Sequence, residues 1–550
     1  MPMAPPLIRL GYNQGVKASL DPTAVPPNAL WRARNVRLTE SNLVRIRPGS
    51  VGFSASRGPG PVQGLAAAFD GLLMVHNQDL IYYDAAANET VLAQGSIGAS
   101  AGEPVEIIRW TFEGQEMAFI FTGSGIWQTD GTPEGTKLVE PYEPEDGEAS
   151  NLLLDEDTNE QDLDSGPAKA RVALLRGHRL VVAYGNTVYM SEPNRADYWP
   201  ANQWFNLPED GGHIVALAQW YGALIVFRNK DIWAYFKADE TDTQSIGLVL
   251  QHASIGCAAR RSVVPIPGTG IAFLGGPQGS VDNVYVLTYV QGVENMVRAE
   301  PVGGDIRNIL VDAVNRYGLQ GASAIYYDGE YRLSIPANQG EERVFVLDTQ
   351  YGQGWFIDTG PRSTQYAVAG GSLYAAIWNE GRIDRIERQA LRDRDDPIPV
   401  HIRWRRESLL GPSRIKRLFI VTVSKVRRAQ DDIFWWHGAF GDLLFGEGET
   451  VMGEASTGTD QTLDVTLYVD GRVFRVERLT VKDQHLEALG RLGHEPVRIY
   501  EARFRPSLKG QFVQVEINAT TPDEDIAILG YGVEYGVRSR LQGRREGVAV

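Results

Sequence analysis

Basic residues are concentrated in one short segment of a chain that is otherwise acidic. Nine Lys and Arg side chains lie between residues 403 and 428, where only Glu407 opposes them. A basic patch on an acidic protein attracts an acidic partner surface, and a solvated strand face is the equally open alternative. The candidate partner-interface residues are Arg403, Arg405, Arg406, Arg414, Lys416 and Arg417.

Aromatic and glycine residues dominate a second segment, residues 434–445, which reads FWWHGAFGDLLF. Such a composition is typical of a loop that inserts into another surface, for example a neighbouring subunit. A loop that packs on its own domain is the alternative. The candidate contact residues are Phe434, Trp435, Trp436, Phe440 and Phe445.

Acidic residues form an insertion at 138–168, with eleven Asp and Glu and no Lys or Arg. The pattern favours a solvated surface loop. The residues that suggest a calcium site are Asp155, Asp157 and Asn159. A helix-loop-helix calcium motif needs Gly at its sixth position and Glu at its twelfth, but Glu160 and Gly166 stand there, so that motif fails.

Enzymatic signatures are absent from the sequence. It contains no phosphate-binding P-loop, no GxSxG nucleophile motif and no HExxH zinc motif, and its eight His residues are scattered. The single cysteine, Cys257, rules out an internal disulfide and a cysteine-based zinc site. We therefore predict no catalytic residues, no cofactor and no metal. Carboxylate pairs that cleave glycosides leave no linear signature, so a glycoside hydrolase or a carbohydrate-binding protein remains the alternative.

Net charge and hydropathy exclude further classes. The 550 residues carry a formal charge of −16, which argues against a general nucleic-acid binder and against docking on an anionic membrane. No stretch approaches 18 apolar residues, so we expect no membrane-spanning helix.

A loosely repeated unit of short apolar strands and tight turns accounts for the middle of the chain. Its strands fall at 64–69, 72–75 and 80–83 in the first copy, and comparable sets recur around residues 105–127, 172–190, 214–235, 271–287, 324–347 and 366–376. Asp-Gly, Glu-Gly and Tyr-Gly pairs between the strands are typical of β-hairpins. A spacing of roughly 40–50 residues is that of propeller blades, which must stack in a ring to bury both faces. We predict an all-β fold with a β-propeller of six or seven blades; unrelated hairpins in a β-sandwich are the alternative.

The repeat defines three regions: an N-terminal arm and closing segment at 1–60, the propeller at 61–395, and a C-terminal domain at 396–550. Segments 417–423, 463–469, 473–476, 502–505, 512–517 and 526–529 predict strands, several with strict apolar–polar alternation. They indicate a β-sandwich-like platform domain. Helical patterns are scarce; 313–319 and 481–492 are the best candidates for short helices.

Two groups of short motifs resemble the tail nozzle proteins of short-tailed bacteriophages, also called tail tubular or tail hub proteins. The first comprises residues 20–30, the Ala-Arg-Asn-Val-Arg segment at 33–37, and a segment at 43–49 that ends in Arg-Pro-Gly. The second comprises residues 179–183, 188–193, 198–200, 223–227, 231–233 and 256–263. In that family a Pro, Ala-x-Asn and Arg-Pro-Gly arm precedes a β-propeller. The acidic insertion has no counterpart that we identify.

This resemblance implies a structural virion protein. Its subunits would form a ring, usually of six copies, below the portal and adaptor ring; DNA would pass through the central channel, and fibres or spikes would attach nearby. An acidic wall suits such a channel, because each neutralised phosphate would add affinity and friction. The resemblance also suggests that the basic cluster faces an acidic ring protein and that residues 434–445 form a constriction or an inter-subunit plug.

Overall fold

The computed structural model divides into two compact units: one contains Met1–Gly49, Tyr351–Phe356 and Arg388–Val550, and the other Ser50–Gln350 and Ile357–Glu387. The described residues are 7–39, 42–99, 102–112, 114–236, 247–289, 297–317, 319, 321–335, 344–350, 354–425, 462–476, 480–484, 497–520 and 525–537. The expected propeller range, 61–395, compares with 50–387 for the second unit.

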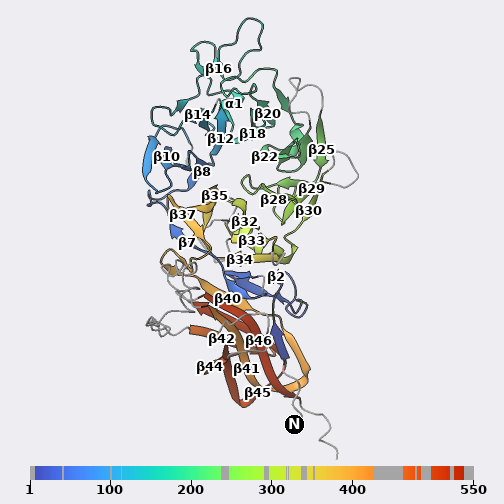
Figure 1. The fold of residues 1–550 in the computed structure, drawn as a ribbon. Coiled ribbons are helices and arrows are strands. Elements are labelled where there is room, and N and C mark those ends of the chain that lie inside the picture. The colour runs from blue at the N-terminus through green and yellow to red at the C-terminus, as the bar shows by residue number, and fades with distance from the viewer. Residues whose placement is uncertain are drawn as a thin grey trace, which may run out of the picture. The chain divides into compact units, whose positions relative to one another are not determined.

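The second unit is a seven-bladed β-propeller, in which the sheets are arranged radially around one axis (Figure 1). Strands are given from the innermost outwards. The first blade contains β8 (Val62–Ala68), β9 (Gly71–His76), β10 (Asp79–Tyr83) and β11 (Glu89–Ala93), and the second contains β12 (Glu106–Phe112), β13 (Gln115–Phe121), β14 (Ile126–Thr129) and β15 (Lys137–Leu138). The third contains β18 (Val172–Arg176), β19 (Arg179–Tyr184), β20 (Thr187–Met190) and β21 (Trp204–Asn206), and the fourth contains β22 (Ile214–Trp220), β23 (Ala223–Arg228), β24 (Ile232–Tyr235) and β25 (Leu248–His252).

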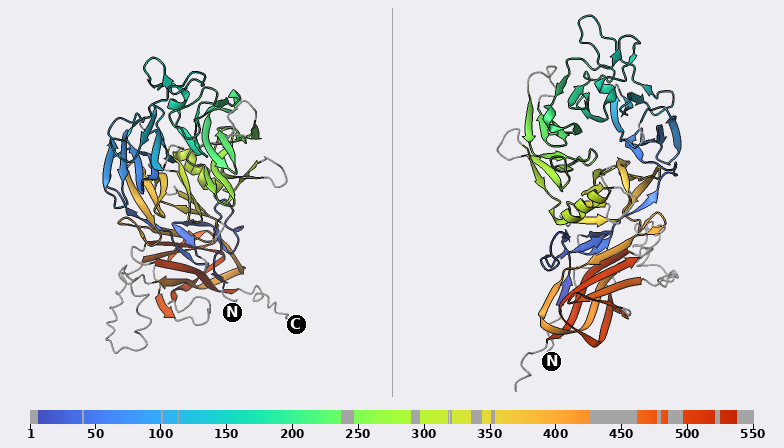
Figure 2. Two further views of the ribbon diagram at one scale, coloured as in Figure 1. Left: turned by 45° about the horizontal axis from the view of Figure 1, so that its top comes forward. Right: turned by 180° about the vertical axis from the view of Figure 1, so that it is seen from behind.

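The last three blades complete the ring (Figure 2). The fifth has a split inner edge, and its strands are β26 (Ile255–Cys257), β27 (Val264–Ile266), β28 (Gly270–Pro277), β29 (Asn283–Tyr289) and β30 (Val297–Pro301). The sixth contains β31 (Ser323–Tyr327), β32 (Glu330–Ser334), β33 (Val344–Asp348) and β34 (Gly354–Asp358). The seventh contains β35 (Ser363–Ala369), β36 (Ser372–Ile377) and β37 (Arg382–Glu387), and β7 (Gly49–Gly52) pairs beside β37. A strand from before the first blade therefore joins the last blade and closes the ring.

Mirror-image turns connect the inner strands of several blades. Phe69 and Asp70 both have positive φ, at 52° and 59°, and Tyr221 and Gly222 follow the same pattern at 46° and 81°. These backbone angles match the right-handed twist of the flanking strands. The Tyr221-Gly222 pair therefore forms the expected turn, whereas the first-blade turn is Phe69-Asp70, one residue before the expected Asp70-Gly71 pair, because Gly71 begins β9.

The propeller core lies between adjacent blades. Leu73 of the first blade and Ile120 of the second share one cluster of buried apolar side chains. Phe227 and Phe273 belong to the cluster between the fourth and fifth blades, with ring centroids 5.2 Å apart. Each sheet thus buries both faces against its neighbours, which explains why a propeller blade does not fold alone.

Helices are short in the described residues of the propeller unit. They are α1 (Gly166–Lys169), α2 (Arg307–Tyr317), and the single 3-10 turns η1 (Glu209–Gly211) and η2 (Gly304–Ile306). The helix expected at 313–319 is therefore α2, which begins six residues earlier.

The other unit is β-rich and combines both ends of the chain. Eleven of its strands share one hydrogen-bonded sheet: β1 (Leu7–Leu10), β4 (Arg32–Arg34), β5 (Val36–Leu38), β6 (Val44–Ile46), β40 (Pro399–Arg403), β41 (Glu407–Lys425), β42 (Thr462–Val469), β43 (Arg472–Val476), β44 (Thr480–Gln484), β45 (Val497–Thr520) and β46 (Asp525–Val537). The remaining strands are β2 (Gln14–Val16), β3 (Ala29–Leu30), β38 (Arg392–Asp393) and β39 (Asp396–Pro397).

Long strands organise this sheet. β45 pairs with β41 along one edge and with β42 and β44 along the other, so the segments expected as separate strands at 502–505 and 512–517 belong to one strand. The helix expected at 481–492 is wrong for its described part, because Thr480–Gln484 is strand β44 and pairs with Val497–Glu501.

Candidate functional site

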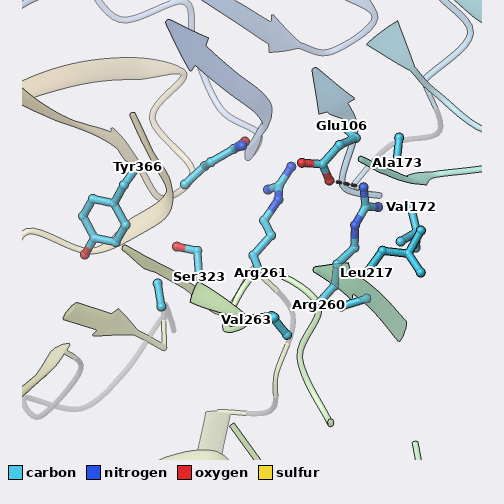
Figure 3. Close-up of a pocket in the computed structure, with 12 residues that line it drawn as sticks. Glu106, Val172, Ala173, Leu217, Arg260, Arg261, Val263, Ser323 and Tyr366 are labelled. Carbon is cyan, nitrogen blue, oxygen red and sulfur yellow. Dashed lines mark hydrogen bonds and ion pairs between the residues drawn. The ribbon is translucent and has the colours of Figure 1, made fainter. Parts of the chain in front are cut away.

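A cavity of about 200 Å³ lies where the innermost strands of the propeller converge (Figure 3). Six of the seven blades contribute to its wall. The lining residues are Glu106, Val172, Ala173, Ala216, Leu217, Arg260, Arg261, Val263, Ser323, Ala324, Gln365 and Tyr366. This cavity is the candidate site, because it gathers charged side chains on the propeller axis.

The fifth blade places two consecutive arginines at this site through its split inner edge. Cys257 of β26 pairs with Gly275 of β28, and Val264 of β27 pairs with Ala272 of the same strand. Six residues therefore lie between the two paired positions on the β26–β27 side, but only two lie between them on β28. The excess residues leave the sheet as a short loop. Ser262 fixes this loop, since its Oγ donates to Ala259 O at 2.6 Å and accepts from Leu274 N at 2.9 Å.

Arg261 links the fifth blade to other blades across the axis. Its guanidinium donates to Val105 O at 3.0 Å and Thr364 O at 3.3 Å, and it also donates to Gln63 O. Its backbone carbonyl accepts from Ala324 N at 2.7 Å. The three acceptors belong to the first, second and seventh blades or to the residues preceding them, and the donor Ala324 belongs to the sixth, so Arg261 has a structural role at the centre of the ring.

Arg260 forms an ion pair with Glu106, whose carboxylate lies between the two guanidinium groups in Figure 3. Burial lowers the pKa of Arg261 to about 10; Glu106 opposes this shift, and the like charge of Arg260 adds to it. Arg261 nevertheless remains protonated at neutral pH. The lining residues therefore carry two positive charges and one negative charge.

Acid–base hydrolysis finds little support in this arrangement. A glycosidase uses two carboxyl groups on opposite sides of the scissile bond. Glu106 is the only carboxylate among the residues that line the cavity, and it is paired with Arg260. Burial raises the pKa of Tyr366 to about 12 and that of Cys257 to about 12, so neither is an activated nucleophile at neutral pH.

Arg260 and Arg261 were not predicted as site residues, and residues 256–263 stood out only through their resemblance to the nozzle family. The sequence nevertheless contains a partial signal. Two consecutive arginines stand between a strand that contains Cys257 and an apolar strand that begins near residue 271, within a propeller repeat. Charged residues in that position interrupt the innermost strand and face the axis.

The basic cluster is extensively paired inside its own unit. The Nε atom of Arg403 lies 3.4 Å from Glu516, and its Nη2 donates to Gln514 at 3.1 Å. Its guanidinium also lies over the rings of Trp31 and Tyr468, at 4.9 and 4.2 Å. Arg403 therefore fastens β40 to β45 and to an N-terminal residue.

Arg405 and Arg417 have acidic partners as well. Arg405 Nε lies 3.3 Å from Glu407, a carboxylate that Arg9 Nε also contacts at 2.7 Å. Arg417 Nε lies 3.5 Å from Glu534 of β46. The sequence did not predict Glu516 and Glu534 as partners of the cluster, because they lie about a hundred residues further along the chain. Antiparallel strand pairing brings them beside the cluster.

The other three cluster residues are half-buried. Arg406 donates its backbone N–H to Pro22 O at 2.8 Å. Arg414 and Lys416 lie on β41, where Arg414 is opposite Lys509 and Gly536. The candidate aromatic residues at 434–445 lie outside the described part of the chain.

The acidic insertion is an ordered lobe that projects from the second and third blades, near the label β16 in Figure 1. It contains β16 (Leu154–Asp155) and β17 (Glu160–Gln161). Nine of its eleven acidic residues are exposed, as expected for a solvated surface. Within the described residues, no group of three or more His, Cys, Asp or Glu side chains is placed to hold a metal ion.

Buried amides, and not the acids, attach this lobe to the propeller. Asn151 donates to Tyr142 O at 2.9 Å and to Asp197 O at 2.8 Å, and its Oδ1 accepts from Trp199 N at 2.9 Å. Gln161 likewise accepts from Ile126 N at 2.7 Å. The acidic side chains make mainly local contacts: Asp155, Asp162 and Glu148 each accept a backbone N–H within the lobe, and Asp164 pairs with Lys169.

An exposed aromatic cluster lies at the hairpin of β22 and β23. Trp220 stacks on Tyr289 with ring centroids 4.5 Å apart, and Tyr221 meets Tyr289 edge-on at 5.4 Å. Tyr221 is 76% exposed and has φ of 46°, an unusual angle for a bulky residue.

Comparisons with known proteins give only remote structural likenesses. No family model matches the chain, and no curated protein matches it. The computationally designed Ika8 protein is 7% identical over 61% of this chain and 99% of its own, with a TM-score of 0.35. The extracellular domain of the putative hybrid two-component system BT4673 from B. thetaiotaomicron is 9% identical over 62% of this chain and 40% of its own, with a TM-score of 0.38. BamB from Moraxella catarrhalis is 11% identical over 64% of this chain and 90% of its own, with a TM-score of 0.33. In the described residues, no helix is long and apolar enough to cross a membrane.

Proposed function

We propose that this chain is a structural subunit of the tail nozzle of a short-tailed bacteriophage. In this role several copies, six in the usual arrangement, form a ring below the portal and adaptor proteins of the virion. The ring surrounds the DNA channel and offers attachment points for fibres or spikes. The chain acts by assembly and not by catalysis.

The observation that carries the proposal is the set of contacts that the nozzle-like arm motifs make with one another and with residues 392–399. The Asn of the Ala-x-Asn motif, Asn35, accepts from Arg47 Nε of the Arg-Pro-Gly motif at 2.9 Å, and its Nδ2 donates to Pro399 O at 2.6 Å. Arg47 is 1% exposed and forms an ion pair with Asp393. At Gly49 a Cβ atom would lie 2.1 Å from Arg392 O. The residues that resemble the nozzle family thus contact one another and connect segments that are far apart in the sequence.

The propeller axis itself is unsuitable for DNA. Its cavity is about 200 Å³, and the side chain of Arg261 crosses it to reach several blades. A duplex would require these contacts to break. The proposal therefore assigns the DNA channel to the space enclosed by several copies.

Charge supports the same assignment. The acidic lobe carries eleven of the negative charges, and most of them are exposed. A wall of this sign repels phosphate groups within about one Debye length, roughly 10 Å at 0.1 M salt. DNA can then slide past without a Lys or Arg contact that must be broken at each step.

The basic cluster remains the proposed contact with an acidic ring protein, and the structure refines how to test it. Reversing Arg405 would remove one of the two arginines that contact the buried Glu407 and would place a second carboxylate beside it. Arg406 and Arg414 are therefore better probes. The double charge reversal R406E/R414E should weaken docking to the partner ring by about tenfold or more, with unchanged thermal stability; unchanged docking would refute this interface.

The decisive experiment is to determine the oligomeric state and location of the intact chain. We expect size-exclusion chromatography with light scattering, alone and with the adaptor protein encoded nearby, to give a closed ring of several copies. Antibody labelling of purified particles should mark one vertex at the tail. A chain that stays monomeric with the adaptor, and that is absent from particles, would refute the proposal.

A carbohydrate-binding role is the second candidate, and the exposed aromatic cluster favours it. The exposed ring of Tyr221, with the half-buried Trp220 beside it, provides a flat apolar face on which a sugar ring can stack. A glycan array distinguishes the two roles. Specific glycan binding that is lost in Y221A would support this candidate; no binding to any glycan would remove it.

A further inference from the structure

The axial cavity has an excess of positive charge. Arg260 and Arg261 are opposed only by Glu106 among the lining residues. The other titratable lining residue, Tyr366, is neutral because burial raises its pKa to about 12. One guanidinium charge is consequently left without a carboxylate partner in the wall.

Backbone carbonyls compensate this charge only partly. The acceptors of Arg261 are the carbonyls of Gln63, Val105 and Thr364, which are neutral groups. Its Nε atom is buried and has no acceptor among the described residues. The lowered pKa of Arg261 has the sign expected when burial and a like charge outweigh the attraction of one carboxylate.

Arg260 retains unused hydrogen-bonding capacity. A guanidinium carries five N–H donors in a planar fork. The only partner of Arg260 within the described part of the chain is Glu106, through Nη2, and its side chain is 13% exposed. Ser323 also lines the cavity, but its hydroxyl already donates to Ser363 O at 3.3 Å, so the donors for a ligand come from the guanidinium. A planar anion placed here would meet several donors at once.

We propose that the axial cavity binds a small oxyanion, such as a monocarboxylate or inorganic phosphate, against Arg260 and Arg261. The volume of about 200 Å³ suits a small acid and excludes a nucleotide or an oligosaccharide. Small side chains such as Ala173, Ala216 and Ala324 leave room for the ligand beside the guanidinium groups, and Ser323, Gln365 and Tyr366 complete the wall.

Glu106 sets the affinity of this site. Its carboxylate competes with the ligand for Arg260, since both need the same N–H donors. Neutralising Glu106 raises the net charge of the wall from one positive charge to two. The proposal therefore predicts opposite effects for the two partners of a single ion pair, which no purely structural role of the pair would produce.

Isothermal titration of the full-length chain tests the proposal, with sodium acetate and sodium phosphate in separate arms at ionic strength balanced by sodium chloride. We expect one saturable site per chain for at least one anion. The variant R260Q should weaken binding by about tenfold or more, and E106Q should tighten it by about threefold or more. The arm with the lower Kd identifies the preferred anion class.

A matched control is R298Q, which removes one positive charge from an exposed ion pair with Glu300 on β30. It should bind both anions as the wild type does. Far-UV circular dichroism verifies that each variant is folded, and if R260Q fails to fold, E106Q alone decides the test. The absence of saturable binding in both arms, wild-type affinity in R260Q, or unchanged or weaker affinity in E106Q would overturn the proposal.

Discussion

The ion pair between Arg228 and Asp231 closes the hairpin of β23 and β24 and offers a quantitative test of the propeller. Arg228 is 0% exposed, and its Nε donates to Asp231 Oδ1 at 2.6 Å. The same carboxylate oxygen accepts from Trp233 Nε1 at 3.0 Å, and a second Arg228 nitrogen donates to Pro208 O. Both charges are therefore buried and mutually dependent.

Removing the carboxylate should be costly. Breaking a buried ion pair at one partner typically costs about 3–5 kcal/mol, because the other charge stays buried without compensation. We expect D231N to lower the free energy of unfolding by that amount. The propeller unit has about 330 residues, and at about 2.1 cal/mol/K of unfolding entropy per residue this corresponds to a loss of about 4–7 °C in Tm.

Removing both charges should restore most of this stability. Hydrophobic residues of similar volume often replace a buried pair at little cost, so R228M/D231L should lie within about 2 kcal/mol of the wild type. Calorimetry and urea unfolding of R228M, D231L and R228M/D231L measure the coupling. A loss below about 1 kcal/mol in D231N, or a double variant as unstable as the sum of the singles, would contradict the reasoning.

Three further predictions follow from the described contacts. A hydrogen bond from His401 is the largest cause that lowers the pKa of Glu516 to about 2. Its stabilising effect should be present above about pH 4.3 and be lost as the pH falls towards 2. Because solvent screens this half-buried group, E516Q should lower stability at pH 7 by only about 1 kcal/mol and flatten acid unfolding measured by circular dichroism. Burial raises the pKa of Cys257 to about 12, so a thiol reagent at pH 8 should label the chain only after denaturation; rapid labelling of the native protein would contradict this. N151A removes buried hydrogen bonds at the base of the acidic lobe and should speed proteolytic cleavage at 140–164 without a change in far-UV circular dichroism; unaltered cleavage would count against this anchor.

Local patterns predicted most of the propeller, because each hairpin is specified within a few residues. Runs such as 72–75 and 80–83 lie inside β9 and β10, and the Tyr221-Gly222 turn adopts the positive φ angles expected of a tight hairpin. Strand β7 was not predicted, since Gly49–Gly52 is short and pairs beside β37, more than 300 residues away. Ring closure is a long-range event that no local window reports.

Long-range pairing also explains where the site predictions are incomplete. The basic cluster was defined in a window that contains one acidic residue, Glu407, whereas β45 and β46 bring Glu516 and Glu534 beside it. The charge of a strand face depends on its neighbours in the sheet as much as on its own sequence. Arg260 and Arg261 illustrate the same limit, because their importance appears only when the blades converge on one axis.

In the acidic lobe, the residues that hold the fold and most of the residues that carry the charge are different. Leu153, Asn151 and Gln161 are buried and hold the lobe, while nine acidic side chains are exposed. The ion pairs Lys169–Asp164 and Lys137–Glu140 involve only two of the eleven acids, and such surface pairs contribute little to stability. Most of the exposed acids therefore add little to the attachment of the lobe, while their mutual repulsion costs free energy. A surface of this charge repels other negative groups, and in the proposed nozzle it would repel the phosphate backbone of DNA in transit.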